Sequence, residues 1–395
     1  MAFPELVKNL NILDSLAYEF NEDYLISLRP NIAREHYRRE ENGGDVIRWK
    51  TNSDSFRGEE LDLTPKHRVI VYGDSNIQAR FSDSAQTFPG QLARYLHESG
   101  ITDVEVINAG VVGFGPDQIF IRFSNEIDRF KPDLVIFHVF ADNDFGDIIR
   151  NRLFELDVDG NLIRTDYKKT VDTHLAVSKD RKLKLFLSQL LTVRAFKKAT
   201  SYLLSTGANT EANGTIWQFN APTMQSKKNA VLNILKKDDA EYLHYKESLP
   251  GQYSHFADHY DIDIALYPEK ESSKIKKRLM EQVLMKASKL AKEKGINLMV
   301  LIQPSRVDLT VGNSPFDYEY LQQYPDYKRS NLTAAVEEIC LSQDVRSLNL
   351  FDVFRENDPQ SLFFKSGNNH WTDRGQRLAA KETARYIIDH SMIKH

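Results

Sequence analysis

The chain has 395 residues, 41% of them hydrophobic and 11% aromatic, which is enough to bury a sizeable core in one enlarged domain or two ordinary ones. Its 52 basic and 56 acidic residues leave a formal net charge of −4 without long blocks of one sign, which argues against a surface for nucleic acid or anionic lipid. A small neutral or weakly charged substrate fits this balance better.

The first 20 residues lack the basic patch, the continuous apolar stretch and the small-residue cleavage site of a secretory signal. No apolar run reaches the length of a membrane-spanning helix. We therefore expect a cytoplasmic protein, or a secreted or periplasmic one if a targeting segment is missing from this chain. The single cysteine, Cys340, excludes a disulfide framework and is expected to be buried, and nothing indicates an oligomeric state.

The elements predicted along the chain begin with residues 1–66, which mix aromatic, aliphatic and charged residues and are expected to form an ordered N-terminal extension. Five short apolar runs then predict strands buried on both faces, at residues 67–75, 104–110, 132–140, 296–304 and 345–354. Stretches with helical spacing separate these runs, and such alternation is typical of a doubly wound sheet. We predict a flavodoxin-like three-layer α/β/α core with a five-stranded parallel sheet, formed by residues 67–150 and 272–395.

The third and fourth strands are separated by much more chain than one crossover helix needs, so residues 151–271 are predicted to be an insertion. It opens with a predicted hairpin whose turn contains Asp159, Gly160 and Asn161. The glycine is misplaced for an EF-hand loop, so calcium is not expected there. Helical spacing over residues 181–205 predicts a helix that packs on the core, with a lid over a substrate pocket as the alternative.

A second metal hypothesis rests on the histidines of the insertion. His255 and His259 are spaced as i and i+4, with Asp261 or Asp263 nearby as a further ligand. A metal site needs a third convergent ligand and supporting partners, which the pattern does not supply. We predict neither a metal nor a cofactor.

A serine follows the first predicted strand directly, in the run Gly73, Asp74 and Ser75. Open α/β sheets carry their ligand sites at the carboxyl ends of the strands. Gly73 allows a tight turn there, and the amide of Ser75, outside the sheet ladder, can point at a developing oxyanion. Ser75 is therefore a candidate nucleophile.

Two further strand ends carry candidate hydrogen-bond donors. The second strand leads into a loop with Gly110, Gly113 and Gly115, whose amides can approach a substrate without a side chain in the way. The third strand leads into Asn143, whose side-chain amide can donate. Both stretches are also typical of ordinary turns.

A histidine precedes the last predicted helix. Thr372 can cap that helix, with Gly375 and Gln376 in its first turn, so His370 lies on a short loop at the carboxyl side of the sheet. An isolated histidine is usually structural, but this position favours a base that could deprotonate Ser75.

Together these segments resemble the four blocks of SGNH/GDSL hydrolases. In the family's order, they are GDSN at residues 73–76, Gly113 after Asn108, the pair Asn143 and Asp144, and HW at residues 370–371. The resemblance covers residues 67–150 and about 272–395, and the segment 51–60 is also similar to the lead-in of some bacterial members. It implies that Ser75 is the nucleophile and His370 the base. It also implies an oxyanion hole formed by the Ser75 amide, Gly113 and Asn143.

Two positions depart from the family pattern. Ala141 stands where the family usually has glycine, which is a mild change. Asn368 stands where an aspartate would orient His370, and it accepts a hydrogen bond without supplying a negative charge. In the serine-protease triad the same loss costs about 10⁴-fold in kcat. Either a backbone carbonyl or another acid orients the imidazole, or the enzyme is slow. Asp373 is one candidate for that acid, and a structural role at the start of the helix is its alternative.

These residues predict a serine-dependent carboxylic ester hydrolase that forms an acyl-enzyme, with Ser75, His370 and Asn368 as the catalytic set. The expected substrate is a small-molecule or carbohydrate ester. One alternative is an O-acyltransferase that passes an acetyl group to a carbohydrate hydroxyl. The other is a non-catalytic carbohydrate-binding module on the same fold, which the Asn368 replacement favours.

Overall fold

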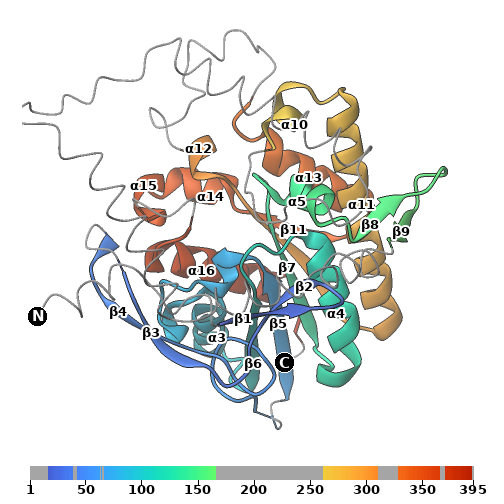
Figure 1. Ribbon diagram of the computed structural model, residues 1–395. Coiled ribbons are helices and arrows are strands. Elements are labelled where there is room, and N and C mark those ends of the chain that lie inside the picture. Colours follow the sequence, from blue (N-terminus) through green and yellow to red (C-terminus); the bar gives the residue numbers. More distant parts are fainter. Residues whose placement is uncertain are drawn as a thin grey trace, which may run out of the picture.

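The computed structural model describes residues 17–38, 42–62, 64, 66–165, 261–309, 328–364 and 370–393. At its centre, five parallel strands form one sheet in the spatial order β11-β10-β7-β5-β6 (Figure 1). The strands are β5 (His67–Gly73), β6 (Val104–Gly110), β7 (Leu134–Phe140), β10 (Asn297–Gln303) and β11 (Arg346–Asn349). This is the strand order of flavodoxin-like sheets, with the topological switch point between β5 and β7, and it confirms the predicted fold class.

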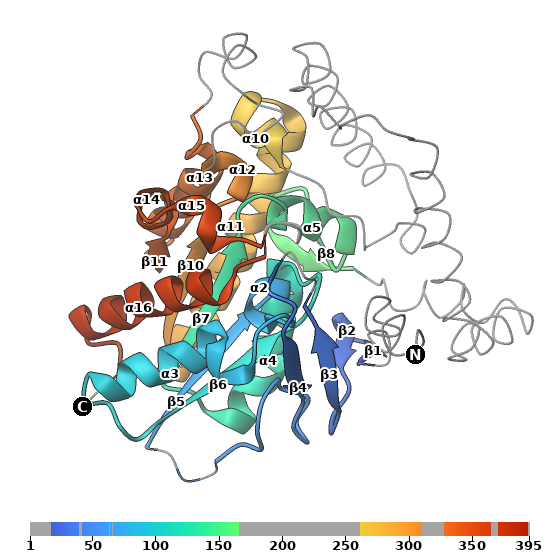
Figure 2. The same ribbon diagram turned by 90° about the vertical axis from the view of Figure 1, so that its left-hand side faces the viewer.

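Helices cover both faces of the sheet, because successive strand residues point to opposite sides. In β5, Val69 and Val71 belong to one buried cluster, while Ile70 and Tyr72 belong to the other. The first cluster packs against α3 (Phe88–Glu98) and α16 (Asp373–Asp389), and the second against α4 (Pro116–Phe130), α11 (Glu271–Lys294) and α13 (Asn331–Ser342). Figure 1 shows α3 and α16 on one side of the strands and α4 and α11 on the other, and Figure 2 looks at the sheet from the side of α3 and α16. Four of these helices lie between the strands, where stretches with helical spacing were predicted, and α16 is the helix predicted after His370, so the alternation is confirmed.

The prediction for the fifth strand was wrong at its carboxyl end. The strand β11 stops at Asn349, and the next residues form the short helix α14 (Phe351–Glu356). Phe351 and Phe354 are spaced to reach the same buried cluster from one side of a helix, and the side chain of Asn349 accepts a hydrogen bond from the Phe351 amide at 3.0 Å. An apolar run of this length does not distinguish strand from helix by periodicity alone.

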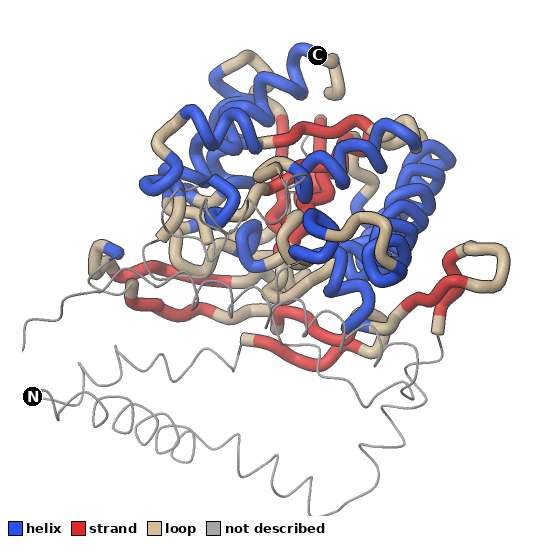
Figure 3. Tube along the Cα trace, turned by 90° about the horizontal axis from the view of Figure 1, so that it is seen from above, coloured by secondary structure: helices blue, strands red, loops and turns tan. Residues whose placement is uncertain are grey.

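The N-terminal extension forms two antiparallel hairpins at the side of the core (Figure 3). One consists of β1 (Tyr18–Asn21) and β2 (Leu25–Leu28), and the other of β3 (Ala33–Tyr37) and β4 (Val46–Lys50). The following segment lies along the edge of the sheet, where the Arg57 amide donates to the Asn108 carbonyl at 3.1 Å. Phe56 packs edge-on against Phe130 of α4. The extension thus covers an edge that would otherwise be open to pairing.

The insertion begins after α5 (Asp144–Asn151) with the hairpin β8 (Phe154–Leu156) and β9 (Leu162–Arg164), which confirms the predicted turn. Gly160 in that turn has φ +78°, a conformation that favours glycine. The helix predicted at 181–205 and the histidines His255 and His259 lie outside the described residues. The described chain resumes at residue 261, followed by α10 (Ile262–Leu266).

Asp261, the first described residue after the gap, lies beside the segment that follows β7. Its amide donates to the Asp142 carbonyl at 2.6 Å, and its buried carboxylate accepts from the Gly146 amide and from Lys276 of α11, both at 2.9 Å. The ion pair with Lys276 occupies one of the two carboxylates, Asp261 and Asp263, that the metal hypothesis named. Within the described ranges, no group of three or more potential ligands is arranged to hold a metal ion.

Four short helical segments complete the described chain: α2 (Ser75–Gln78), the 3₁₀ turn η3 (Ser84–Gln86), α12 (Arg306–Leu309) and α15 (Pro359–Leu362). In the part of the chain that the structure describes, no helix has the length and apolar character needed to cross a membrane.

Candidate active site

Ser75 and His370 lie within hydrogen-bonding distance of each other although 295 residues separate them in sequence. The serine is the first residue of α2, directly after β5, and its Oγ is 2.8 Å from Nε2 of His370. Asp74 caps α2 by accepting a hydrogen bond from the Asn76 amide at 2.8 Å. A hydroxyl and an imidazole at this separation are the arrangement that an activated serine requires. The two residues border a small hollow of about 10 Å³.

The segment that carries His370 is fixed from both sides. Its carbonyl accepts a hydrogen bond from the Phe364 amide at 3.0 Å, and the next residue, the buried Trp371, donates its amide to Oδ1 of Asn76 at 3.3 Å. Gln376 of α16 donates to the Asn76 carbonyl at 3.0 Å. Asn76 therefore joins the turn that carries Ser75 to the segment that carries His370. This role was not predicted from the sequence.

Two glycines allow the close packing around Ser75. A Cβ on Gly73 would lie 2.9 Å from the Cβ of His138, and one on Gly110 would lie 2.2 Å from the backbone nitrogen of Gln78 in α2. Neither distance leaves room for a side chain. The carboxyl end of β6 therefore needs glycine at residue 110, because that residue packs directly against α2.

The two predicted oxyanion donors stand at the ends of the strands that flank β5. Gly113 has φ +72° and open space where a Cβ would be. Asn143 begins α5, and its Nδ2 donates to Oδ2 of Asp147 at 3.0 Å. Neither residue lines the hollow beside Ser75 and His370, so their role in an oxyanion hole stays a prediction.

Asp373 was the alternative candidate for orienting His370, and its carboxylate binds other groups. Nη2 of Arg38 donates to both of its oxygens, at 2.7 and 2.8 Å, and the Ser82 hydroxyl donates to one of them at 2.6 Å. These contacts fit the structural role that its place at the helix start favours, with Thr372 as the predicted cap. Asn368 lies outside the described residues, and Ala141 is buried at the end of β7.

A second histidine lies beneath the serine turn and was not singled out from the sequence. His138 of β7 is fully buried, with Nε2 2.8 Å from Oε1 of Gln303 and its ring edge-on to Trp371. Its Nδ1 is 3.3 Å from Oδ1 of Asp74 but is not aligned as a hydrogen bond. Burial lowers the pKa of His138, and the nearby Asp74 only partly opposes this, which favours a neutral ring. The sequence did offer a signal for this buried residue, because His138 is a polar residue inside the continuous apolar run at residues 132–140.

Two buried carboxyls lie behind the loops after β6 and β7. Burial, with Asp74 and Asp147 as neighbouring negative charges, raises the pKa of Asp144 well above its usual range. Burial also raises the pKa of Asp117 to about 7, although Asn151 donates to its Oδ1 at 3.0 Å. Both carboxyls are therefore expected to stay protonated to higher pH than an exposed aspartate.

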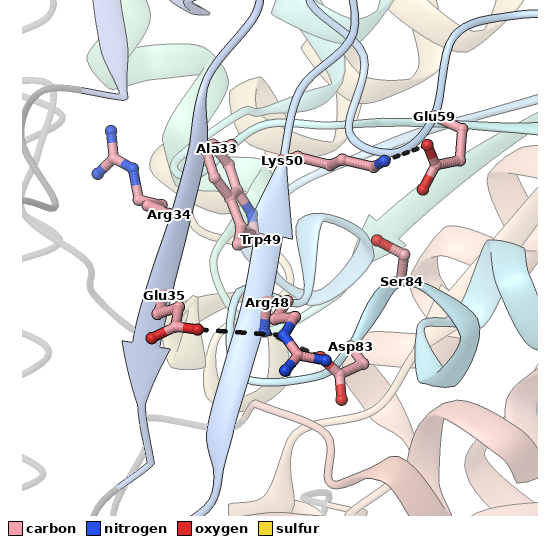
Figure 4. A pocket seen from close by; sticks show the side chains of 9 residues that line it. All are labelled: Ala33, Arg34, Glu35, Arg48, Trp49, Lys50, Glu59, Asp83 and Ser84. Carbon is pink, nitrogen blue, oxygen red and sulfur yellow. Dashed lines mark hydrogen bonds and ion pairs between the residues drawn. The ribbon is translucent and has the colours of Figure 1, made fainter.

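A larger hollow of about 540 Å³ lies on the hairpin of β3 and β4 (Figure 4). Three basic and three acidic residues line it, together with Trp49 and small residues, and Oδ1 of Asp83 accepts a hydrogen bond from the Arg48 amide at 2.9 Å. It contains no nucleophile and base in contact. We take the smaller hollow as the candidate active site, because Ser75 and His370 are in contact there.

Comparison with known proteins supports the resemblance found in the sequence. Residues 263–394 match the family model described as "SGNH hydrolase-like domain, acetyltransferase AlgX". The matched segment includes His370, while Ser75 precedes it. Over these residues the predicted resemblance to SGNH hydrolases is confirmed. No curated protein sequence matches the chain.

Solved structures of esterases also align with most of the chain, at low similarity. A lipase/acylhydrolase from Enterococcus faecalis is 11% identical, with 82% of this chain and 96% of that one covered and a TM-score of 0.37. The acetyl xylan esterase AlAXEase is 12% identical, with 81% and 99% covered and a TM-score of 0.37. A catalytic mutant of an acetylxylan esterase from Geobacillus stearothermophilus is 10% identical, with 83% and 96% covered and a TM-score of 0.39. We base no functional argument on likenesses of this size.

Proposed function

We propose that this protein is a serine-dependent carboxylic ester hydrolase with Ser75 as nucleophile and His370 as base. The observation that supports this most directly is the 2.8 Å separation between Oγ of Ser75 and Nε2 of His370 at the carboxyl end of the central strand. The site also stands beside the switch point of the sheet, where folds of this class bind their ligands.

The proposed reaction has two halves. Nε2 of His370 takes the hydroxyl proton of Ser75 as Oγ bonds to the carbonyl carbon of the ester, and the carbonyl oxygen becomes an oxyanion. Amides of Ser75 and Gly113 and the Asn143 side chain are the proposed donors to that oxygen. The imidazolium returns its proton to the departing alcohol, which leaves an acyl group on Ser75. Water then attacks the acyl-enzyme with His370 again as base, which releases the carboxylic acid and restores the serine.

A fluorophosphonate probe tests the nucleophile directly, because an activated serine displaces its fluoride and becomes phosphonylated, whereas ordinary hydroxyls do not react. We expect labelling of Ser75 in the folded protein, loss of labelling in Ser75→Ala, and full labelling in the matched control Ser84→Ala. Hydrolysis of p-nitrophenyl acetate should follow the same pattern. Absence of labelling in folded wild-type protein would reject the hydrolase and favour the carbohydrate-binding module.

The O-acyltransferase remains the second candidate, because the family model matched by residues 263–394 is described as an acetyltransferase. Both activities share the acyl-enzyme and differ in the acceptor that removes the acyl group. Acetate release and acetyl transfer can be measured together with p-nitrophenyl acetate as donor and xylo-oligosaccharides as acceptors. Transfer that dominates at modest acceptor concentration would replace hydrolysis as the function. A cytoplasmic location stays a prediction for cell fractionation to check.

A further inference from the structure

One arginine of the N-terminal extension reaches the segments that surround His370. Arg38 follows β3, and its amide donates to the Asp45 carbonyl across the hairpin at 2.9 Å. Its side chain is only 10% exposed and points to the core, where Nη2 donates to both carboxylate oxygens of Asp373. Asp373 is the first residue of α16 and lies three residues after His370. A contact between residues 38 and 373 thus fixes the start of the helix that follows the histidine.

The same guanidinium contacts the aromatic groups beside the imidazole. Nε of Arg38 donates to the Phe81 carbonyl at 2.6 Å, and the guanidinium carbon lies 5.6 Å from the centre of the Phe364 ring. Phe81 stands edge-on to the His370 ring, with 6.2 Å between the ring centres, and also edge-on to Phe364. Arg38 therefore touches both aromatic neighbours of the site and the helix start at once.

The buried Ser82 completes this arrangement, since its hydroxyl donates to the carboxylate that Arg38 binds, at 2.6 Å. Planar, charge-assisted hydrogen bonds of this kind are stronger and more directional than neutral ones. Three segments that are distant in sequence, at residues 38, 81–82 and 373, are joined around one ion pair. The imidazole of His370 lies edge-on to Phe81, three residues before Asp373.

We propose that Arg38 is a positioning residue that holds His370 in line with Ser75, acting through Asp373 and Phe81. This inference rests on the proposed function, because it assumes that the 2.8 Å contact is the productive one. Arg38 does not touch the substrate in this proposal. Its effect is on the alignment of the imidazole, where a displacement of about 1 Å is expected to cost about 10²-fold in rate.

The ion pair also sets the charge near the imidazole. Of the described residues that line the hollow, Arg80 is the charged neighbour of the histidine, with its guanidinium over the Phe81 ring, and the Arg38–Asp373 pair lies behind it. In Arg38→Ala, Asp373 loses its cation, which favours the imidazolium and raises the pKa of His370. In Asp373→Asn, Arg38 keeps only the more exposed Asp45 as its anion, 3.1 Å from Nη1, and the loss of the Asp373 charge lowers that pKa. The two single variants should shift the histidine in opposite directions.

The test compares kcat, KM and the acid limb of the pH profile of kcat/KM for p-nitrophenyl acetate hydrolysis. We expect Arg38→Ala to lower kcat by about 10- to 100-fold with little change in KM, and to move the acid limb to higher pH. Asp373→Asn should move the limb to lower pH, and the double variant should bring it back near the wild-type position. Arg38→Lys keeps the charge without the planar fork, so kcat should fall while the limb stays in place.

Arg48→Ala is the matched control on the same hairpin, because that side chain is 88% exposed and its nearest carboxylate, on Glu35, is 4.0 Å away. It should leave kcat and the pH profile unchanged. Wild-type kcat in folded Arg38→Lys, together with an unshifted limb in folded Asp373→Asn, would overturn the positioning role and leave the hydrolase intact. A wild-type protein that neither hydrolyses the ester nor labels at Ser75 would overturn the proposed function, and this inference with it.

Discussion

Replacement of Gly110 by alanine should disable the candidate site by moving α2, the helix that begins with Ser75. A Cβ at this position would lie 2.2 Å from the backbone nitrogen of Gln78 and 2.7 Å from the carbonyl carbon of Ile77, whereas ordinary contacts begin near 3.4 Å. Because both obstacles are backbone atoms, no side-chain rotation relieves the overlap. The strand β6 and the helix α2 must separate by roughly 1 Å, an overpacking that costs about 1–3 kcal/mol of stability.

The effect on catalysis should be larger than this loss of stability suggests. Ser75 is the first residue of α2, so a movement of the helix breaks its 2.8 Å alignment with His370. A displacement of about 1 Å corresponds to a fall in kcat of about 10²-fold, while the fold survives. Ester hydrolysis with p-nitrophenyl acetate and urea unfolding measure the two quantities separately.

Gly295→Ala provides the control for this experiment. Gly295 caps α11 with φ +69° and has open space around the missing Cβ, so alanine there should cost about 1 kcal/mol through backbone strain alone. It stands at the amino end of the sheet, before β10, and should leave kcat unchanged. A folded Gly110→Ala protein with wild-type kcat would refute the idea that contact between β6 and α2 sets the position of Ser75.

Two further predictions follow from buried groups. The pKa of Asp117 is about 7 in the folded chain and lower when unfolded, so the folded state holds an extra proton between about pH 4 and 7. This carboxyl therefore makes the free energy of unfolding fall with rising pH, by up to about 1.4 kcal/mol per pH unit. Asp117→Asn should remove that part of the slope in urea unfolding between pH 5 and pH 7, and an unchanged slope would contradict the assignment. Burial raises the pKa of Cys340 to about 12, so iodoacetamide should alkylate it only after unfolding. Rapid alkylation of the folded protein would show that the thiol is accessible.

The sequence was sufficient to predict the sheet and the convergence of Ser75 and His370, because both have local signatures. Strands buried on both faces give continuous apolar runs, and Ser75 and His370 each sit at the end of an element that such a run or a capping pattern identifies. Parallel strands bring their carboxyl ends to one edge, so the convergence of the two residues followed from the fold class. The prediction failed at Phe351, where an apolar run passes from strand into helix without a change in composition.

The contacts that support the pair had no such signature. Asn76 and Trp371 were each visible as part of a motif, yet their hydrogen bond joins segments 295 residues apart. The contact between Arg38 and Asp373 spans 335 residues, and an arginine after a short strand looks like any exposed charge. Contacts of this kind depend on how the extension folds back on the core, which residue spacing along the chain does not determine.

Arg57 shows how the extension supports the turn after α2, the helix that begins with Ser75. It is fully buried, and its guanidinium donates to the carbonyls of Gln78, Ala79 and Ser82, which form the turn that leaves α2. Burial lowers the pKa of Arg57 to about 9, which still leaves the side chain charged at neutral pH. A buried carbonyl without a donor costs about 1–3 kcal/mol, so this one side chain stabilises a turn that could not be buried alone.

The two arginines of the extension act on consecutive parts of one loop. Arg57 binds the carbonyls on either side of Arg80 and Phe81, and Arg38 binds the carbonyl of Phe81 itself. This loop connects the helix that carries Ser75 to the aromatic wall beside His370. The position of that wall therefore depends on residues that precede the first strand of the sheet, and the proposed catalytic geometry involves the extension and the core together.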